Sequence, residues 1–227
     1  MNISIIIPVY NEEESIVNTI KDIKNNVKIF NNYEILIVDD CSTDNSASIT
    51  KEYDSAIKLI RNKVNKGQSY SIYRGIKESK YENIITIDAD GQNNPLDFEK
   101  LIRIYKENNC DLVSGIRVNR KDSLVKIISS KIANYVRRKI LYDNCSDTGC
   151  SLKLFNKKIF LKIPYFNGLH RFIPSFFEGL GHKVMYVNVR HRKRLKGKSK
   201  YGTLNRLFNG IYNIIVVKKI IKELKKS

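Results

Sequence analysis

The chain has 227 residues, of which 42% are hydrophobic, so it is long enough for one α/β domain with a full core, and disorder is not its default state. Its net charge of +18 is unevenly divided: residues 1–115 hold 14 Lys and Arg against 18 Asp and Glu, whereas residues 116–227 hold 27 against 5. The basic half is therefore expected to attract polyanions, namely nucleic acid, anionic lipid headgroups or phosphorylated substrates.

Composition also argues against disulfide-linked, zinc-bound and membrane-spanning chains. The four Cys lack paired CxxC spacing and there are only three His, so we predict reduced thiols without a zinc site. Met1 leads directly into strand-like sequence, so we expect no signal peptide. The longest uncharged apolar stretch near the C-terminus, Leu207 to Val217, is far shorter than the roughly 20 residues that span a bilayer.

Buried-strand patterns alternate with helical patterns along the first half of the chain. Residues 3–9 form a continuous apolar, β-branched run, typical of a strand buried on both faces. Three Glu at 12–14 favour a helix start, because the helix dipole attracts acidic residues there. We predict strands at 3–9, 34–38, 56–61, 84–88 and 111–115, and helices at 12–26, from a cap at 42–44 to 53, at 68–79 and from Pro95 onward. This order predicts an α/β fold with a mostly parallel sheet and helices on both faces.

Two carboxylates, Asp88 and Asp90, end the fourth predicted strand. The two-residue period of a strand sends both side chains to one side and Ala89 to the other. Carboxylates this close repel each other unless a cation lies between them, and such oxygen ligands suit Mg²⁺ or Mn²⁺. Polar clusters at 10–12 and 39–40 also follow strands, at the sheet edge where α/β proteins bind ligands. We predict a metal-bridged phosphate site here, with an ordinary acidic turn as the alternative.

Two segments of the basic half, 124–141 and 204–225, combine an apolar helical stripe with clustered Lys and Arg. In the second, the stripe is formed by Leu204, Leu207, Phe208, Ile211, Ile214 and Ile215. A helix packed on its own domain explains either pattern, and so does a helix lying in a membrane interface. The charge of this half favours the membrane.

The first half resembles the inverting glycosyltransferase family 2, with its GT-A fold, through the segments IIIPVYNEEESI, EILIVDDCSTDNS, NKGQSYSIYRGIK and ITIDADGQNNP. The second half is similar to the dolichol-phosphate mannosyltransferase branch and its bacterial polyprenyl-phosphate relatives, through VSGIRV, SSKIAN, DTGCSLKLF, GLHRF and HRKRLKGKSKYG. The resemblance implies a GT-A fold and Mg²⁺ or Mn²⁺ as cofactor. It also implies inverting transfer of a sugar from a GDP- or UDP-linked nucleotide sugar to polyprenyl or dolichyl phosphate.

The resemblance also implies roles for individual residues. Asp88 and Asp90 would hold the metal with support from Gln92, and His170 and Arg171 stand where the relatives place a basic residue over the donor. Arg117 would meet the acceptor phosphate, and Asp147 could orient a sugar hydroxyl, act as a base or be structural. The residues implied for the nucleotide sugar are Pro8, Tyr10, Glu12, Val38, Asp40, Ala89, Gln92, His170, Arg171, Arg194 and Lys200, and those for the acceptor phosphate are Arg117, Lys126, Ser130 and Ser199.

Two of these implied contacts involve the basic segments. Lys126 stands where Arg is expected, and Lys lacks the bidentate fork of a guanidinium. Arg194, Ser199 and Lys200 resemble a flexible loop that closes on a pyrophosphate, whereas a solvated surface is the alternative for this charged run.

The resemblance implies a catalytic domain at 1–203, divided into a nucleotide-binding half (1–115) and an acceptor-binding half (116–203), and a membrane-proximal helical tail at 204–227. We expect peripheral association with the cytoplasmic face of a membrane, with or without a separate transmembrane partner, and no nucleic acid. One alternative is a family 2 enzyme that acts on a glycan or lipid hydroxyl, for which Asp147 would be the general base. A basic nucleic-acid-binding module and a nucleotidyltransferase are further alternatives.

Overall fold

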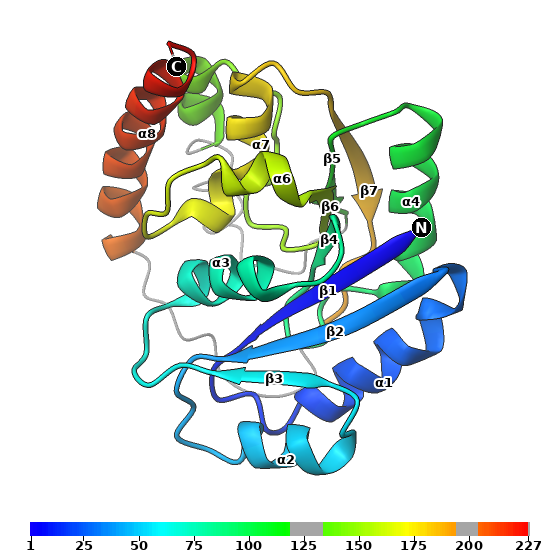
Figure 1. Ribbon diagram of the computed structural model, residues 1–227. Coiled ribbons are helices and arrows are strands. Elements are labelled where there is room, and N and C mark those ends of the chain that lie inside the picture. The colour runs from blue at the N-terminus through cyan, green and yellow to red at the C-terminus, as the bar shows by residue number, and fades with distance from the viewer. Residues whose placement is uncertain (119–133, 194–203, 227) are drawn as a thin grey trace.

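The computed structural model describes residues 1–118, 134–193 and 204–226, with side chains of the last helix described from residue 212. Within these residues a seven-stranded sheet forms the centre of the protein (Figure 1). The strands lie in the order β3-β2-β1-β4-β6-β5-β7. Their bounds are β1 (Asn2–Val9), β2 (Asn32–Asp39), β3 (Lys58–Arg61), β4 (Asn83–Thr86), β5 (Leu112–Arg117), β6 (Lys153–Asn156) and β7 (Val184–Val189).

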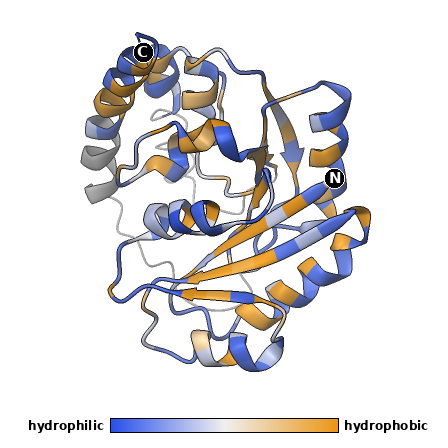
Figure 2. Ribbon diagram, in the orientation of Figure 1, coloured by the Kyte–Doolittle hydropathy of each residue, from blue (hydrophilic) through white to orange (hydrophobic). Residues whose placement is uncertain are grey.

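Helices cover both faces of the sheet (Figure 1). One face carries α1 (Ile16–Asn26), α2 (Ser46–Tyr53) and α4 (Phe98–Glu107), with the short 3₁₀ turns η1 (Val27–Ile29) and η2 (Pro95–Asp97) beside them. The other carries α3 (Gln68–Glu78), α6 (Lys157–Leu161), α7 (Leu169–Gly179) and α8 (Leu204–Leu224). Figure 2 shows hydrophobic strands and two-sided helices, as burial on both faces of the sheet requires. The predicted α/β fold with a mostly parallel, mixed sheet is confirmed.

The first two helices begin later than predicted, because the preceding residues form turns. Glu12 O accepts the N–H groups of Ser15 (3.0 Å) and Ile16 (2.9 Å), so the acidic run lies before α1 rather than in its first turn. Similarly, Asp44 Oδ1 accepts from Ser46 N (3.0 Å) and Ser46 Oγ (2.6 Å), and α2 starts at Ser46. A main-chain carbonyl before α1 and a carboxylate before α2 thus accept N–H groups that a helix start leaves free.

Strand β6 runs antiparallel to both of its neighbours, β4 and β5, whereas the other pairs in the sheet are parallel. Its first residue, Lys153, is opposite Thr86 at the end of β4 and Ser114 on β5. The loop that enters β6 therefore reaches the sheet edge where the parallel strands end. Neither β6 and β7 nor the helices α6 and α7 were predicted from the sequence.

The described part of α8 packs on α7 through one face. Ile214, Val217 and Ile221 are buried there, and a Cβ added at Gly179 of α7 would lie 2.7 Å from Ile221 Cδ1. Ile215, predicted to share a stripe with Ile214, is instead 63% exposed. The self-packing interpretation thus holds for one face of this helix. In the described residues, no helix combines the length and the apolar character needed to span a membrane.

Candidate functional site

The acidic pair lies just beyond β4 and is held from two sides. Gln68 Nε2, at the start of α3, donates to Asp88 Oδ1 at 2.8 Å, and Gln92 N donates to Asp90 Oδ1 at 3.1 Å. Burial and the charge of Asp90 raise the pKa of Asp88 to about 6, while a hydrogen bond from Ser151 and the charges of Lys153 and Arg117 act in the opposite direction. The two carboxylates are therefore close enough to interact.

This donor set fits Mg²⁺ or Mn²⁺. Both ions bind through one or two carboxylates together with substrate phosphates, and a cation would relieve the repulsion that raises the pKa of Asp88. In the described part of the chain, no group of three or more His, Cys, Asp or Glu could form a full protein cage. The remaining ligands would thus be water, the diphosphate or the side-chain oxygen of Gln92, whose Nε2 lies 3.4 Å from His191 Nε2 and 3.5 Å from Arg192 O.

Arg117, at the end of β5, is held by Asp147 from the loop that enters β6. Arg117 Nε donates to Asp147 Oδ2 at 2.8 Å, Arg117 Nη2 donates to Asp147 Oδ1 at 2.7 Å, and the main-chain N–H of Arg117 donates to Asp147 Oδ2 at 3.1 Å. The side chains are 16% and 6% exposed. A Cβ added at Gly149 would lie 2.5 Å from Arg117 Nη2, so this glycine gives the guanidinium its space. The bidentate geometry orients Arg117 and occupies both oxygens of Asp147.

Asp40, one of the residues implied for the nucleotide sugar, is 3% exposed and binds its own chain. Its Oδ1 accepts from Asn62 Nδ2 (2.7 Å) and Lys66 N (3.0 Å), and its Oδ2 accepts from Gly67 N (2.7 Å). Gly67 caps α3 with a φ of +84°, a conformation that favours glycine. Asp40 therefore orders the loop that leads into α3, the helix that carries Gln68.

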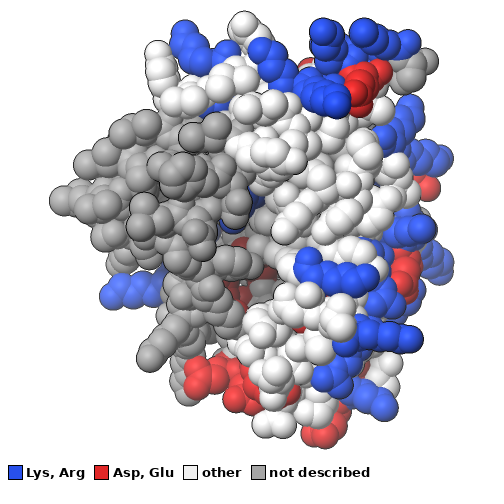
Figure 3. All heavy atoms as spheres, turned by 90° about the vertical axis from the view of Figure 1, so that its left-hand side faces the viewer, with Lys and Arg blue, Asp and Glu red and all other residues white. Residues whose placement is uncertain are grey.

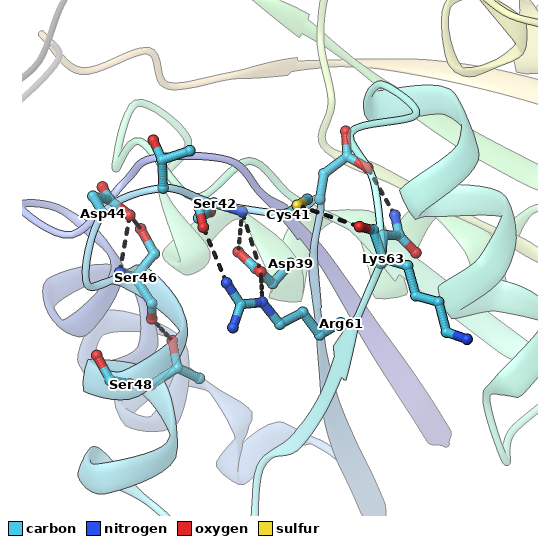
Figure 4. Close-up of polar contacts among 12 residues, drawn as sticks. Asp39, Cys41, Ser42, Asp44, Ser46, Ser48, Arg61 and Lys63 are labelled. Atoms are coloured by element: carbon cyan, nitrogen blue, oxygen red, sulfur yellow. Dashed lines mark hydrogen bonds and ion pairs between the residues drawn. The ribbon is translucent and has the colours of Figure 1, made fainter.

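The neighbouring aspartate, Asp39, is fully buried and joins the loops after β2 and β3 (Figure 4). Arg61 Nε lies 3.1 Å from Asp39 Oδ2, and Arg61 Nη2 donates to Ser42 O at 3.1 Å. Cys41, which precedes Ser42 in the chain, has a φ of +62°. Its Sγ lies 3.6 Å from Lys63 O. These contacts fix the ends of β2 and β3, which lie at the same edge of the sheet as the acidic pair.

The other residues predicted at the first two strand ends have mixed surroundings. Val38 is fully buried and a Cβ at Gly75 would lie 2.9 Å from its Cγ2, so only its main chain could reach a nucleotide. Pro8, its partner in register on β1, is half-buried, and Tyr10 is 36% exposed at the same edge. Glu12 Oε2 accepts from Ser15 Oγ at 3.0 Å.

His170, at the start of α7, contacts the start of α3. Ser69 Oγ accepts from Gly168 N at 2.9 Å and lies 2.6 Å from His170 Nδ1. The Ser69 proton is thus available to Nδ1, and we assign the imidazole proton to Nε2. Burial, followed by the charges of Arg171 and Lys153, lowers the pKa of His170 well below 6.5. His170 is therefore a neutral N–H donor at neutral pH, which differs from the basic residue expected over the donor.

Of the remaining predicted residues, Ala89 is buried and its O accepts from Thr19 Oγ1 at 2.9 Å, while Arg171 is half-buried on α7. The predicted residues that lie outside the described residues are Lys126, Ser130, Arg194, Ser199 and Lys200.

Sequence reasoning missed four residues that contact the site, namely Gln68, Ser69, Ser151 and Lys153. The first two follow Gly67 at a helix start, which was a usable signal. The other two are polar residues at alternating positions in DTGCSLKLF, where a buried strand begins.

Several curated proteins are similar to nearly the whole chain. The undecaprenyl-phosphate 4-deoxy-4-formamido-L-arabinose transferase of Pectobacterium carotovorum is 33% identical over 220 residues, which cover 94% of this chain and 66% of that protein. The dodecaprenyl-phosphate galacturonate synthase of Rhizobium johnstonii is 30% identical over 225 residues, which cover 96% of this chain and 66% of that protein. This chain thus spans slightly less than two thirds of the length of these relatives.

Solved structures share the fold at low identity. Glucosyl-3-phosphoglycerate synthase of Mycobacterium tuberculosis, in complex with Mn²⁺, UDP and glucosyl-3-phosphoglycerate, matches with a TM-score of 0.69 and 17% identity over 95% of this chain and 78% of that one. TarS of S. aureus in complex with UDP-GlcNAc matches with a TM-score of 0.67 and 17% identity over 96% of this chain and 66% of that one. The model of the family described as Glycosyl transferase family 2 matches residues 4–163, which confirms the resemblance seen in the sequence and shows that this chain belongs to that family.

Proposed function

We propose that this chain transfers a sugar, with inversion, from a nucleoside diphosphate sugar to a polyprenyl phosphate. The observation that carries the proposal is that one loop joins the acidic strand end to a half-buried arginine. Asp147 accepts from Arg117 Nη2 at 2.7 Å, and Ser151 Oγ lies 2.6 Å from Asn93 Oδ1, which accepts from the main-chain N–H of Asp88 at 3.5 Å. A carboxylate pair suits a metal-bound diphosphate, and a fixed guanidinium suits a phosphate acceptor. The names of the relatives, which are polyprenyl-phosphate sugar transferases, support the same pair of substrates.

The chain's residues would position two anions rather than activate a weak nucleophile. A polyprenyl monophosphate is already anionic at neutral pH, so it needs orientation and charge compensation. Arg117, held by Asp147, would supply both to the acceptor, and Asp88 and Asp90 would hold the divalent ion. That ion, when bound, would neutralise charge on the leaving nucleoside diphosphate.

The pairing of Asp147 argues against transfer to a hydroxyl. That reaction needs a base to remove a proton from a neutral alcohol. Both oxygens of Asp147 accept hydrogen bonds from Arg117, and Gly149 N donates to its Oδ1 at 3.2 Å. A carboxylate so engaged is a poor base, because each of these bonds stabilises its charged form.

Membrane association is part of the proposal, because the acceptor is a lipid. Figure 3 shows Lys and Arg along the upper edge of one face, at the end of the molecule where α8 finishes, and acidic atoms in a hollow beside the grey residues. The outer side of α8 exposes Tyr212 (68%) and Ile215 (63%). Apolar side chains followed by Lys218, Lys219, Lys222, Lys225 and Lys226 suit an anionic membrane surface.

The decisive experiment combines purified protein, Mn²⁺, a panel of UDP- and GDP-sugars and a short polyprenyl phosphate. We expect one donor to yield a lipid-linked sugar with inverted anomeric configuration. UDP-sugars are the first to test, because the solved neighbours bind UDP. The matched control is the same polyprenol without its phosphate, which should give no product. Transfer to the alcohol but not to the phosphate would overturn the proposal.

A further inference from the structure

A buried lysine without a carboxylate partner, Lys153, begins β6 next to the candidate site. Lys153 is 2% exposed, and among the described residues no carboxylate comes within ion-pair distance of its Nζ. Lysines are almost never buried this deeply unless paired, because an uncompensated charge is costly in a protein interior. A residue with this cost invites a functional explanation.

The charge that compensates Lys153 lies further off, in the acidic pair. The ammonium group acts electrostatically on Asp88, and so does Arg117. Lys153 starts β6 opposite Thr86, two residues before Asp88, so its side chain lies on the same face of the sheet as the Thr86 side chain. The charge of Asp88 is thus opposed by Lys153 on β6 as well as by Arg117 on β5.

Lys153 also holds the loop that enters β6. Its Nζ donates to Cys150 O. The next residue, Ser151, has its Oγ 2.6 Å from Asn93 Oδ1 and within hydrogen-bond reach of Asp88, and its O accepts from Thr86 Oγ1 at 2.6 Å. This end of the loop therefore sets the surroundings of the metal-binding carboxylate.

The other end of the same loop orients the acceptor-binding arginine. Asp147 makes the bidentate contact with Arg117, and Cys150 N donates to Asp147 O at 3.3 Å, which closes the turn between the two ends. A displacement of the Cys150 carbonyl would move Ser151 and Asp147 together. One short segment thus contacts both halves of the site, and Lys153 anchors its centre.

We propose that Lys153 is a positioning residue that couples the metal–diphosphate half of the site to the acceptor-phosphate half, by anchoring the 147–151 loop and by balancing the charge of Asp88 and Asp90. This inference deepens the proposed function and rests on it. Lys153 does not touch either substrate in this account, and its effect passes through Ser151 and Asp147.

The test compares Lys153→Met, which keeps the bulk of the side chain, with Lys153→Arg, which keeps its charge. Mn²⁺ is titrated into each protein with saturating UDP, and with GDP in a parallel series, at fixed pH and followed by calorimetry. We expect Lys153→Met to weaken Mn²⁺ binding by about 10- to 100-fold, the usual effect of losing a residue that supports metal ligands. Lys153→Arg should bind within about threefold of the wild type, since its charge and donors remain.

Two further measurements separate positioning from mere stability. The coupling requires KM for the polyprenyl phosphate to rise in Lys153→Met together with the Mn²⁺ dissociation constant. The matched control is Lys157→Met, because Lys157 Nζ also donates to a main-chain oxygen, that of Ser79 at 2.5 Å, but lies on α6 away from the carboxylates. That control should leave both constants unchanged. Lys153→Gln, which retains a donor without the charge, replaces Lys153→Met if the latter does not fold.

The outcomes distinguish this inference from the proposed function. Wild-type protein that binds Mn²⁺ with neither UDP nor GDP overturns the proposed function and the inference with it. Wild-type protein that binds, combined with a folded Lys153→Met or Lys153→Gln whose Mn²⁺ affinity and acceptor KM match the wild type, overturns the inference alone. A lower melting temperature with both constants unchanged makes Lys153 a structural residue and has the same consequence.

Discussion

Breaking the pair between Arg117 and Asp147 should have a large and measurable cost. Asp147→Asn removes the charge and leaves a buried guanidinium with at most a neutral acceptor. The side chains are 16% and 6% exposed, so solvent replaces little of the lost interaction. Breaking a buried pair costs about 3–5 kcal/mol, and we expect about 3 kcal/mol because Asn retains one carbonyl acceptor. For a chain of 227 residues this corresponds to a fall in Tm of about 6–12 °C.

The same variant should impair the acceptor side of the site selectively. Without its carboxylate partner, Arg117 loses its fixed orientation, and KM for the polyprenyl phosphate should rise about tenfold, equivalent to about 1.4 kcal/mol. Calorimetric binding of Mn²⁺ and UDP should change little. Thermal unfolding by circular dichroism and initial-rate kinetics measure the two effects.

Two control variants test the reasoning behind this magnitude. Glu223→Gln breaks an exposed ion pair in which Lys219 Nζ lies 4.0 Å from Glu223 Oε1. This variant should change the free energy of unfolding by less than about 1 kcal/mol. The double variant Arg117→Met/Asp147→Leu replaces both charges by apolar groups and should recover most of the lost stability but none of the acceptor binding. An Asp147→Asn protein with wild-type Tm and wild-type acceptor KM would refute the assignment of Asp147 as the residue that orients Arg117.

Three other variants give further tests. Gly149→Ala should raise the acceptor KM, because the new Cβ would lie 2.5 Å from Arg117 Nη2 and displace the atom that donates to Asp147 Oδ1; an unchanged KM contradicts this. Asp90→Asn should abolish the stabilisation by Mn²⁺ with UDP, about 2.7 kcal/mol at 100 times the dissociation constant, as measured by thermal shift. The contribution of His170 to the Tm of the wild type should be lost as pH drops below 6.5, because the folded protein holds His170 neutral and the unfolded chain gains the proton more easily. His170→Gln should lack that contribution, whereas the control His182→Gln should retain it.

The strand-end positions of the first half could be predicted from the sequence because buried parallel strands have a distinctive pattern. Apolar, β-branched runs ended at polar clusters, and parallel strands that all end at one edge bring those clusters together. Asp88 and Asp90 were predicted as site residues in this way. The approach works where a strand is long, apolar and followed immediately by residues with side-chain oxygens.

The same approach did not anticipate that strand-end residues also bind the chain itself. Asp40 and Val38 occupy suitable positions, yet Asp40 accepts hydrogen bonds from the loop before α3 and Val38 packs against that helix. Loops at a sheet edge leave main-chain N–H groups that need acceptors, and a buried carboxylate is one solution. Residue type and position do not distinguish a carboxylate that binds the chain from one that binds a ligand.

The direction of β6 could not be predicted, and it decides which residues meet at the site. In an all-parallel sheet, the loop that enters a strand lies at the edge opposite the ligand. Because β6 is reversed between β4 and β5, its entering loop lies beside the ends of both, so that Asp147 reaches Arg117 and Ser151 reaches Asp88. The four residues of β6, KLFN, carry no signal for direction, since either direction buries the same side chains. The contacts of Lys153 depend on that reversal, and a parallel β6 would place its charge where no carboxylate pair could compensate it.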